Sequence, residues 1–219
     1  MSLSLKKTDI ILFLLLTLLS TQLYSQDINT NSPPGINRDS LQNIYGHNKN
    51  FIAEYELQSL LALSYYPELK EAEITFRPVD IESVAKTTIT FFSIFNSAEK
   101  HFIIYINTNK SRTGLLLSDA PFNAQVGAIG HELAHVANFR NKSLAGMVWW
   151  SIKYLSNKNR IKTERNTDIA TIAHGLGMEL YSFVYFVLNS SSANDKYKKF
   201  KRLHYLSPSE ILKMAKNVK

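Results

Sequence analysis

The chain has 219 residues, no cysteine and a net charge of +7 at neutral pH. With 45% hydrophobic and 20% charged residues it has the composition of a globular domain that can bury a proper core. The missing cysteines exclude disulfides, lipid attachment at cysteine and thiolate metal sites, so metal ligands must come from histidine, aspartate and glutamate.

Residues 1–25 are typical of a secretory signal peptide. Two lysines precede an apolar run at residues 10–19, and small or polar residues follow as far as Ser25. We expect cleavage near Ser25 and Gln26 and an exported protein, periplasmic or secreted. The run is shorter than the roughly 20 residues of a membrane-spanning helix. An uncleaved anchor is the alternative.

The next segments predict a linker, a helix and several strands. Residues 26–50 are rich in Asn, Ser, Asp, Pro and Gly, which indicates a linker or N-terminal arm. Residues 51–63 have helical periodicity, closed by Pro67. Strand-like runs of β-branched and aromatic residues follow at 72–77, 86–94 and 101–107, and a short edge strand is expected at 114–117.

A helix with the pattern H-E-x-x-H is predicted around residues 126–136, where apolar residues recur at helical spacing. His131 and His135 are four residues apart, so both rings leave the same face of the helix. Two such rings can hold one Zn²⁺ at about 2.0–2.1 Å. Glu132 lies beside that face, where its carboxylate can act as general base on a water molecule at the metal.

The same pattern can also arise in a protein without a metal. Chance gives roughly one such match per hundred sequences of this composition, and the two histidines can form a hydrogen-bonded core pair. Gly127 and Gly130 favour the metal site, because glycine inside a helix costs about 1 kcal/mol relative to alanine. We interpret them as leaving space for a peptide substrate above the metal.

Two more helices are predicted after this one. Ser143 can cap a helix whose apolar side chains share one face: Leu144, Met147, Val148, Ile152 and Leu155. Trp149 and Trp150 are interpreted as core and rim residues, with a membrane surface as the alternative. Residues 163–188 form a very apolar helix, but its Glu164, Asp168 and His174 argue against a transmembrane span.

Residues 191–219 are predicted to be a basic C-terminal tail with a short helix. Ser207, Pro208 and Glu210 form a capping box that opens this helix. The tail carries eight Lys or Arg in its last 24 residues. It is interpreted as a solvated surface, with peripheral contact to an anionic membrane as the alternative. No nucleic-acid-binding module accompanies the charge, so we expect no nucleic-acid partner.

A third ligand is available in the second motif. Glu164 and Asp168 are four residues apart on one helix face, 29 residues or more after His135. A glutamate there can complete a His₂Glu zinc site, and an aspartate can hold a ligand histidine by its other nitrogen. Zinc accepts either carboxylate, so the spacing alone leaves open which acid is the ligand.

The pairing of H-E-L-A-H at 131–135 with Glu164-x-x-x-Asp168 resembles the gluzincin metallopeptidases, particularly the CAAX prenyl protease/HtpX-like peptidases and their compact soluble relatives. The resemblance covers roughly residues 70 to 185. It implies an α+β, zincin-like domain of the minigluzincin type, which we place at residues 51–190, with a small antiparallel-containing sheet, the active-site helix and further helices. It implies zinc bound by His131, His135 and Glu164, with Glu132 as general base. Asp168 would contact a ligand histidine and would not bind the zinc itself.

Gluzincins usually add a residue that steadies the oxyanion, and His174 is the nearest candidate; a structural histidine is the alternative. The runs 102–107 or 114–117 are expected to form a cleft edge along which a substrate pairs as an added strand. We therefore expect an exported zinc-dependent endopeptidase acting on a protein or peptide. The alternatives are a catalytically silent zincin-fold binding or regulatory protein, and a surface-associated interaction protein with an incidental H-E-x-x-H.

Overall fold

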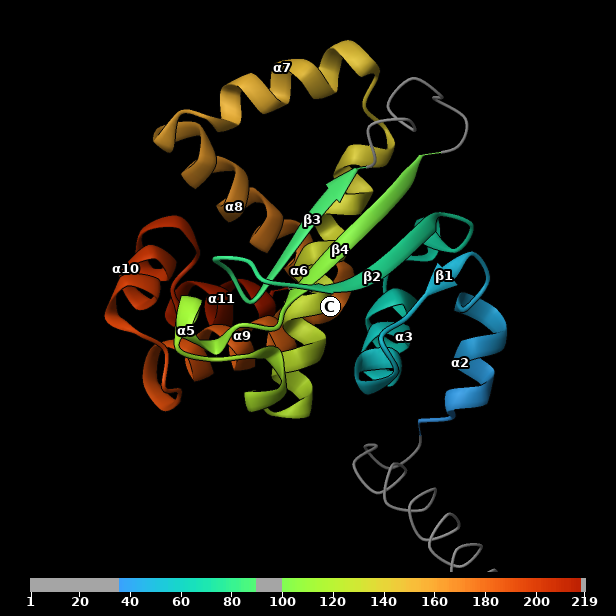
Figure 1. Cartoon of the computed structure of the whole chain (residues 1–219), viewed down its shortest axis with the longest axis horizontal. Coiled ribbons are helices and arrows are strands. Elements are labelled where there is room, and N and C mark those ends of the chain that lie inside the picture. Colours follow the sequence, from blue (N-terminus) through green and yellow to red (C-terminus); the bar gives the residue numbers. More distant parts are fainter. Residues whose placement is uncertain (1–35, 90–99, 218–219) are drawn as a thin grey trace, which may run out of the picture. The chain divides into compact units, whose positions relative to one another are not determined.

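The computed structural model describes residues 36–89 and 100–217 (Figure 1). The signal peptide expected at 1–25, the start of the arm at 26–35 and the second half of the strand expected at 86–94 lie outside these residues. From Asn37 onward the chain forms one unit. It is an α+β unit with a small mixed sheet and several helices, so the expected class is confirmed.

The described residues contain a four-stranded sheet with the order β1-β2-β4-β3. Its strands are β1 Lys49–Asn50, β2 Glu73–Val79, β3 Ala85–Ile89 and β4 His101–Asn107. The pairs β1/β2 and β2/β4 are parallel, and β3/β4 is antiparallel, as expected of an antiparallel-containing sheet. Thr87 of β3 lies opposite Ile104 of β4.

Strand β4 is the most apolar strand, and most of its side chains are buried. Such a continuous apolar run is typical of a central strand that is covered on both faces. Because β4 is paired on both sides, the expectation that residues 102–107 form a free cleft edge is wrong. Among the described strands, β3 pairs with β4 alone and occupies the edge of the sheet.

The edge strand expected at 114–117 is also wrong. This stretch links helix α5 (Lys110–Thr113) to the short 3-10 helix η3 (Leu117–Asp119). Gly114 has φ of 81°, the left-handed conformation that ends α5 and that glycine adopts without strain. Leu115 and Leu117 are fully buried, so the apolar run reflects core packing rather than sheet pairing.

Within the described part of the arm or linker expected at 26–50, residues 38–50 contain a helix and a strand. Helix α2 (Arg38–Tyr45) is capped by the Asn37 side chain, which accepts from the Ser40 backbone N–H at 3.0 Å. Strand β1 follows and pairs with β2.

The helix expected at 51–63 is present in two parts, the 3-10 turn η1 (Ala53–Tyr55) and the α-helix α3 (Glu56–Ser64). It ends before Pro67, which begins a further short 3-10 turn, η2 (Pro67–Leu69).

The H-E-x-x-H segment lies on the long helix α6 (Phe122–Arg140), which packs between the sheet and helices α3, α8 (Asn157–Thr171) and α9 (Gly177–Tyr185) (Figure 1). Its interior is buried on all sides, as expected of a helix within the core. A Cβ on Gly127 would lie 2.1 Å from the Glu179 carbonyl oxygen, and one on Gly130 would lie 2.5 Å from a methyl of Leu176. The two glycines therefore make room for residues 176–180, and their interpretation as substrate space is wrong.

The long apolar helix expected at 163–188 begins earlier and is interrupted. Its parts are α8 Asn157–Thr171, the π-helical segment η4 Ile172–Leu176, α9 Gly177–Tyr185 and the π-helical segment η5 Phe186–Ser190. Gly175 has φ of 94° and breaks the run. Among the described residues, the run Asn157–Ser190 is the one stretch long and apolar enough to cross a membrane by length and composition. Within this stretch Glu164 and Asp168 are buried and contact His131 of α6.

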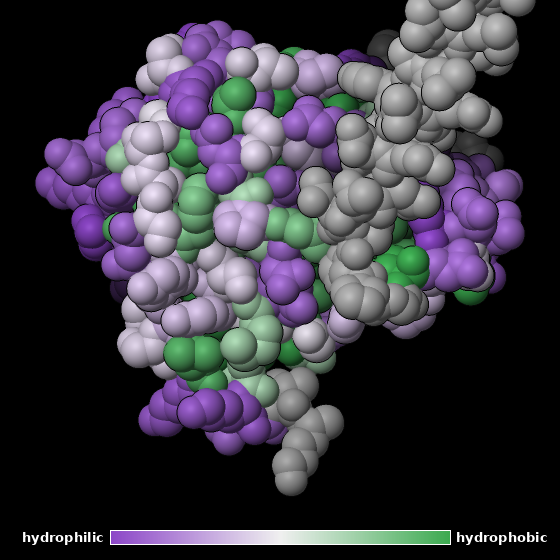
Figure 2. All heavy atoms as spheres, turned by 90° about the horizontal axis from the view of Figure 1, so that it is seen from below, coloured by the Kyte–Doolittle hydropathy of each residue, from purple (hydrophilic) through white to green (hydrophobic). Residues whose placement is uncertain are grey.

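Helix α7 (Leu144–Tyr154) begins at the predicted cap, where the Ser143 side chain accepts from the Gly146 backbone N–H at 3.2 Å. Residues after 190 form α10 (Asp195–His204) and α11 (Pro208–Ala215), and the predicted Ser207/Glu210 capping box is present. Tyr197, Leu206 and Ile211 are buried in the cores, so these residues belong to the folded unit and are not a tail. On the face shown in Figure 2, hydrophobic residues form small groups among hydrophilic ones.

Candidate metal centre

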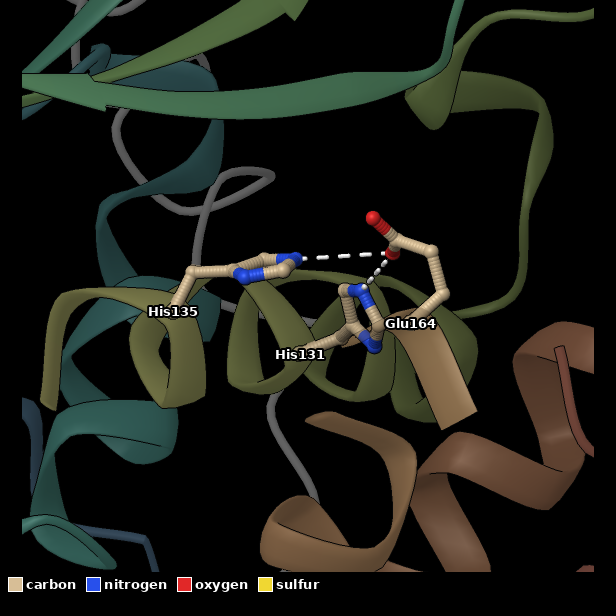
Figure 3. Close-up of side chains that lie close together, drawn as sticks. All are labelled: His131, His135 and Glu164. Atoms are coloured by element: carbon tan, nitrogen blue, oxygen red, sulfur yellow. Dashed lines mark hydrogen bonds and ion pairs between the residues drawn. The ribbon is translucent and has the colours of Figure 1, made fainter. Parts of the chain in front are cut away.

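Helix α6 places His131 and His135 one turn apart in the buried interior of the fold. Their ring centroids are 4.9 Å apart and the ring planes are nearly perpendicular, at 83°. Both side chains leave the helix on the side of α8 and point toward the same space (Figure 3). The prediction from the i, i+4 spacing, that the rings share a face, is confirmed.

Glu164 of α8 points into the same space. Its Oε2 atom lies 3.2 Å from Nε2 of His131 and 3.5 Å from Nε2 of His135 (Figure 3). All three residues are buried, and their nearest ligand atoms lie within 4.8 Å of one another. Two imidazoles and a carboxylate that converge in this way could hold a metal ion.

Asp168 lies one turn after Glu164 and contacts the other side of His131. Its Oδ1 accepts the N–H of His131 Nδ1 at 2.9 Å, and its Oδ2 accepts the backbone N–H of Leu206 at 2.8 Å. Because Asp168 holds Nδ1, the ring presents Nε2 to Glu164. A carboxylate in this position fixes the orientation and tautomer of a ligand histidine.

Thr167 has a similar contact with His135. Its hydroxyl donates to the Thr163 carbonyl at 3.0 Å, so its oxygen is left as an acceptor for Nδ1 of His135 at 3.4 Å. Each histidine of the cluster therefore has its Nδ1 held by a side chain of α8. The sequence pattern did not indicate this role for Thr167.

The charges in the cluster stabilise one another. Burial alone would lower the pKa of His131, but hydrogen bonds to Asp168 and Glu164 outweigh it and raise that pKa to about 10. Burial would raise the pKa of Glu164, but hydrogen bonds to His131 and His135 hold it well below its usual range. In the metal-free protein the two carboxylates thus favour a cation between them, and His131 supplies it as imidazolium at neutral pH.

Glu132 is buried, and its carboxylate is held by the edge strand. The Thr87 hydroxyl lies 2.7 Å from Glu132 Oε2 and 3.0 Å from the Glu132 backbone carbonyl, so its one proton is shared between two acceptors. The structure does not place Glu132 among the three converging ligand residues. It is a separate carboxylate on the same helix, oriented by β3.

Two tyrosines that the sequence motifs did not indicate lie at the cluster. The Tyr154 hydroxyl, on α7, donates to Glu164 Oε1 at 2.5 Å, and the Tyr205 ring centroid lies 5.4 Å from that of His131. Burial and then the charge of Glu164 raise the pKa of both phenols, so both stay protonated as donors. No spacing in the sequence relates these residues to the two motifs.

His174 is placed elsewhere. Its Nδ1 lies 2.8 Å from the Ala170 carbonyl oxygen, and its Nε2 lies 2.9 Å from Glu68 Oε1. Its ring stacks on Tyr66 at a centroid distance of 4.2 Å. Both ring nitrogens are therefore engaged outside the cluster, which gives no support to the expected oxyanion role and favours the structural alternative.

Comparisons of this chain with models of protein families, with curated proteins and with solved structures find no match. Its function must therefore be inferred from the geometry and chemistry of the cluster itself.

Proposed function

We propose that this chain is a zinc-dependent metallopeptidase with a zincin-like fold, in which His131, His135 and Glu164 bind zinc. The observation that carries the proposal is the convergence of Glu164 Oε2 on both Nε2 atoms of the H-E-x-x-H pair, at 3.2 and 3.5 Å. Ligand atoms about 2.0–2.2 Å from a tetrahedral zinc ion lie roughly 3.3–3.6 Å from one another, and both distances from Glu164 are close to this range.

The donor set and its surroundings support a catalytic site rather than a structural one. Two imidazoles and one carboxylate supply three ligands, which leaves a fourth position for water or substrate. The placement of Asp168 on Nδ1 of His131 supports Glu164 as the ligand acid and Asp168 as the residue that orients the histidine. The proposal therefore keeps the two roles that the family resemblance implies, with Glu164 as zinc ligand and Asp168 as partner of a ligand histidine.

Zinc, when bound, supplies a Lewis acid that acidifies water and polarises a peptide carbonyl. Glu132 is the residue that takes a proton from the attacking water and delivers it to the leaving amine. The hydroxyl of Thr87 holds the carboxylate of Glu132 in one orientation. Tyr205, a buried and protonated phenol beside His131, suits a hydrogen-bond donor to the developing oxyanion.

We propose that a peptide substrate pairs with strand β3, in place of the run within β4 expected from the sequence. Among the described strands β3 has one partner, and Thr87 on it contacts Glu132. A peptide that pairs with β3 as an added strand would be held by main-chain hydrogen bonds next to the general base. Export through residues 1–25 is a further part of the proposal, and an N-terminus near Gln26 in the mature protein would support it.

The test is cleavage of a peptide library by the zinc-loaded chain, with and without a chelator, beside Glu132→Gln. We expect chelator-sensitive cleavage by the wild type and loss of cleavage with zinc retained in the variant. Bound zinc without any cleavage would favour the silent binding protein. A chain that binds no metal would favour the interaction protein with an incidental motif.

A further inference from the structure

Helix α7 has an inner face that anchors it beside the metal cluster. Met147, Trp150 and Tyr154 recur at helical spacing and turn inward. The Trp150 ring packs edge-on against Phe139 with centroids 4.6 Å apart, and it stacks on Tyr154 at 4.7 Å. Tyr154 in turn bonds Glu164. This inner face fixes the orientation of the whole helix.

The outer face of the same helix is apolar and exposed. Val148, Trp149, Ile152 and Leu155 have exposed fractions of 53%, 59%, 55% and 86%. Their spacing places them on one stripe, opposite the anchored side chains. In Figure 1 helix α7 runs along the margin of the molecule, with α8 as its main neighbour. A contiguous group of large exposed apolar side chains marks an interaction surface.

The charges around this stripe identify the partner. Residues 141–163 contain five cationic side chains and no aspartate or glutamate. Three of the lysines, Lys153, Lys158 and Lys162, are exposed, and the Lys153 ammonium lies 5.0 Å from the Trp149 ring centroid. An apolar stripe with tryptophan, bordered by cations alone, is typical of a helix that lies in the interface of an anionic membrane.

We propose that α7 docks this protein on an anionic membrane surface, with Val148, Trp149, Ile152 and Leu155 inserted at the boundary between headgroups and acyl chains. The occupant of this surface is therefore lipid and not a second protein. The docking requires the folded helix and its charges, and it does not depend on zinc or on hydrolysis.

Fluorescence tests this proposal at the helix itself, because Trp149 and Trp150 are the two tryptophans of the chain. Residues 10–19 are apolar enough to partition into lipid, so sedimentation with vesicles is not sufficient by itself. In the full chain carrying Trp150→Phe, emission comes from Trp149 alone. We expect a blue shift, and quenching by brominated lipid, with vesicles of phosphatidylglycerol and phosphatidylcholine.

Ile152→Glu places a carboxylate in the stripe at an exposed position, and we expect it to weaken the fluorescence-detected affinity for anionic vesicles at least tenfold. Met178→Glu, an equally exposed apolar position on α9, is the matched control and should leave the affinity unchanged. Vesicles of phosphatidylcholine alone should bind weakly, and salt should reduce binding to the anionic vesicles.

Three results would overturn the proposal. An unshifted Trp149 spectrum with anionic vesicles would show that α7 does not contact the membrane. Loss of binding in Leu203→Glu but not in Ile152→Glu would show that the membrane contact lies on the basic helix α10. A blue shift that grows with protein concentration without lipid, together with a dimer in analytical ultracentrifugation that Ile152→Glu abolishes, would show that the stripe binds a second copy.

Discussion

His131 donates its Nδ1–H to Asp168 at 2.9 Å, and the same ring turns its Nε2 toward Glu164 at 3.2 Å. One histidine therefore separates two carboxylates from the same helix, and only one of them faces the space shared with His135. Asp168 also accepts the backbone N–H of Leu206, which ties the cluster to the segment between α10 and α11. The two acids of the second motif thus have different surroundings and should respond differently to substitution.

Glu164→Gln should remove most zinc binding, because an amide replaces the one carboxylate that faces both histidines. Asp168→Asn keeps the size of the side chain and an acceptor for Leu206, so it should keep most of the metal and lose about 10–100-fold in affinity. Zinc titration with a competing chelator measures both variants. Metal loss in Asp168→Asn combined with retention in Glu164→Gln would reverse the two roles.

Glu132→Gln should retain zinc and fold but lose peptide hydrolysis, because an amide cannot take the proton from water. The glutamine still accepts a hydrogen bond from Thr87, so a change in melting temperature is not expected. Activity and zinc stoichiometry are measured on the same preparation. Near-normal turnover in this variant would exclude Glu132 as the general base.

Zinc binding should release about one proton at neutral pH, because the pKa of His131 is raised to about 10 in the metal-free protein and zinc takes its Nε2. The apparent zinc affinity should therefore rise with pH until that pKa is passed. The stability of the metal-free fold changes with pH in the opposite direction to the zinc affinity. The raised pKa stabilises the metal-free fold fully below about 6.5, and this contribution is lost as the pH rises toward 10.

Calorimetric titration of zinc in two buffers of different ionisation enthalpy counts these protons. Asp168→Asn is the matched variant, because removing the adjacent negative charge lowers the pKa of His131 and should reduce the number of protons released. Zinc binding with no proton release in the wild type would contradict a protonated His131 in the metal-free protein.

Tyr154→Phe should lower zinc affinity by about tenfold, because the phenol orients Glu164 through the hydrogen bond to its Oε1. Phenylalanine keeps the ring against Trp150, so the packing of α7 is retained. Tyr65→Phe, a change at a partly exposed tyrosine on the surface, serves as control. Equal affinities of the Tyr154 variant and the wild type would show that Glu164 is held without this donor.

Gly127→Ala should destabilise the fold more than Gly130→Ala. The new Cβ at 127 would meet backbone atoms of Glu179, which cannot move alone, whereas at 130 it would meet a methyl of Leu176 that can rotate. An overpacking cost of about 1–3 kcal/mol corresponds to a fall in melting temperature of roughly 2–12 °C for a chain of this size. The opposite order of the two melting temperatures would contradict this packing.

The elements that the sequence predicted best are those whose periodicity and burial agree. The H-E-x-x-H helix was predicted because Ile129 and Leu133 repeat at helical spacing in a segment that is buried throughout. The strand at 101–107 was predicted with its correct bounds because it is apolar along its length. Their partners were not predictable, since strand order depends on contacts between distant segments.

The missed elements share a polar surface. Helix α2 has no buried residue, so its composition resembles that of a linker. In α10 many basic residues surround the few side chains, such as Tyr197, that reach the core, so this segment resembles a solvated tail. At the site, the spacing of the two motifs indicated His131, His135 and an acid of the second motif, and the family resemblance selected Glu164, which the structure places beside both histidines. Thr87 and Tyr154 could not be found in this way, because they come from separate elements brought together by the fold.

The zinc content of the purified chain is the most direct test of the proposed metal centre. After dialysis against metal-free buffer, elemental mass spectrometry should find about one zinc per wild-type chain and little in His135→Ala, which lacks one of three ligands. The circular dichroism of the variant should show that the helices are retained. A wild-type chain that binds no zinc when zinc is supplied, or an unchanged stoichiometry in His135→Ala, would contradict the site at His131, His135 and Glu164.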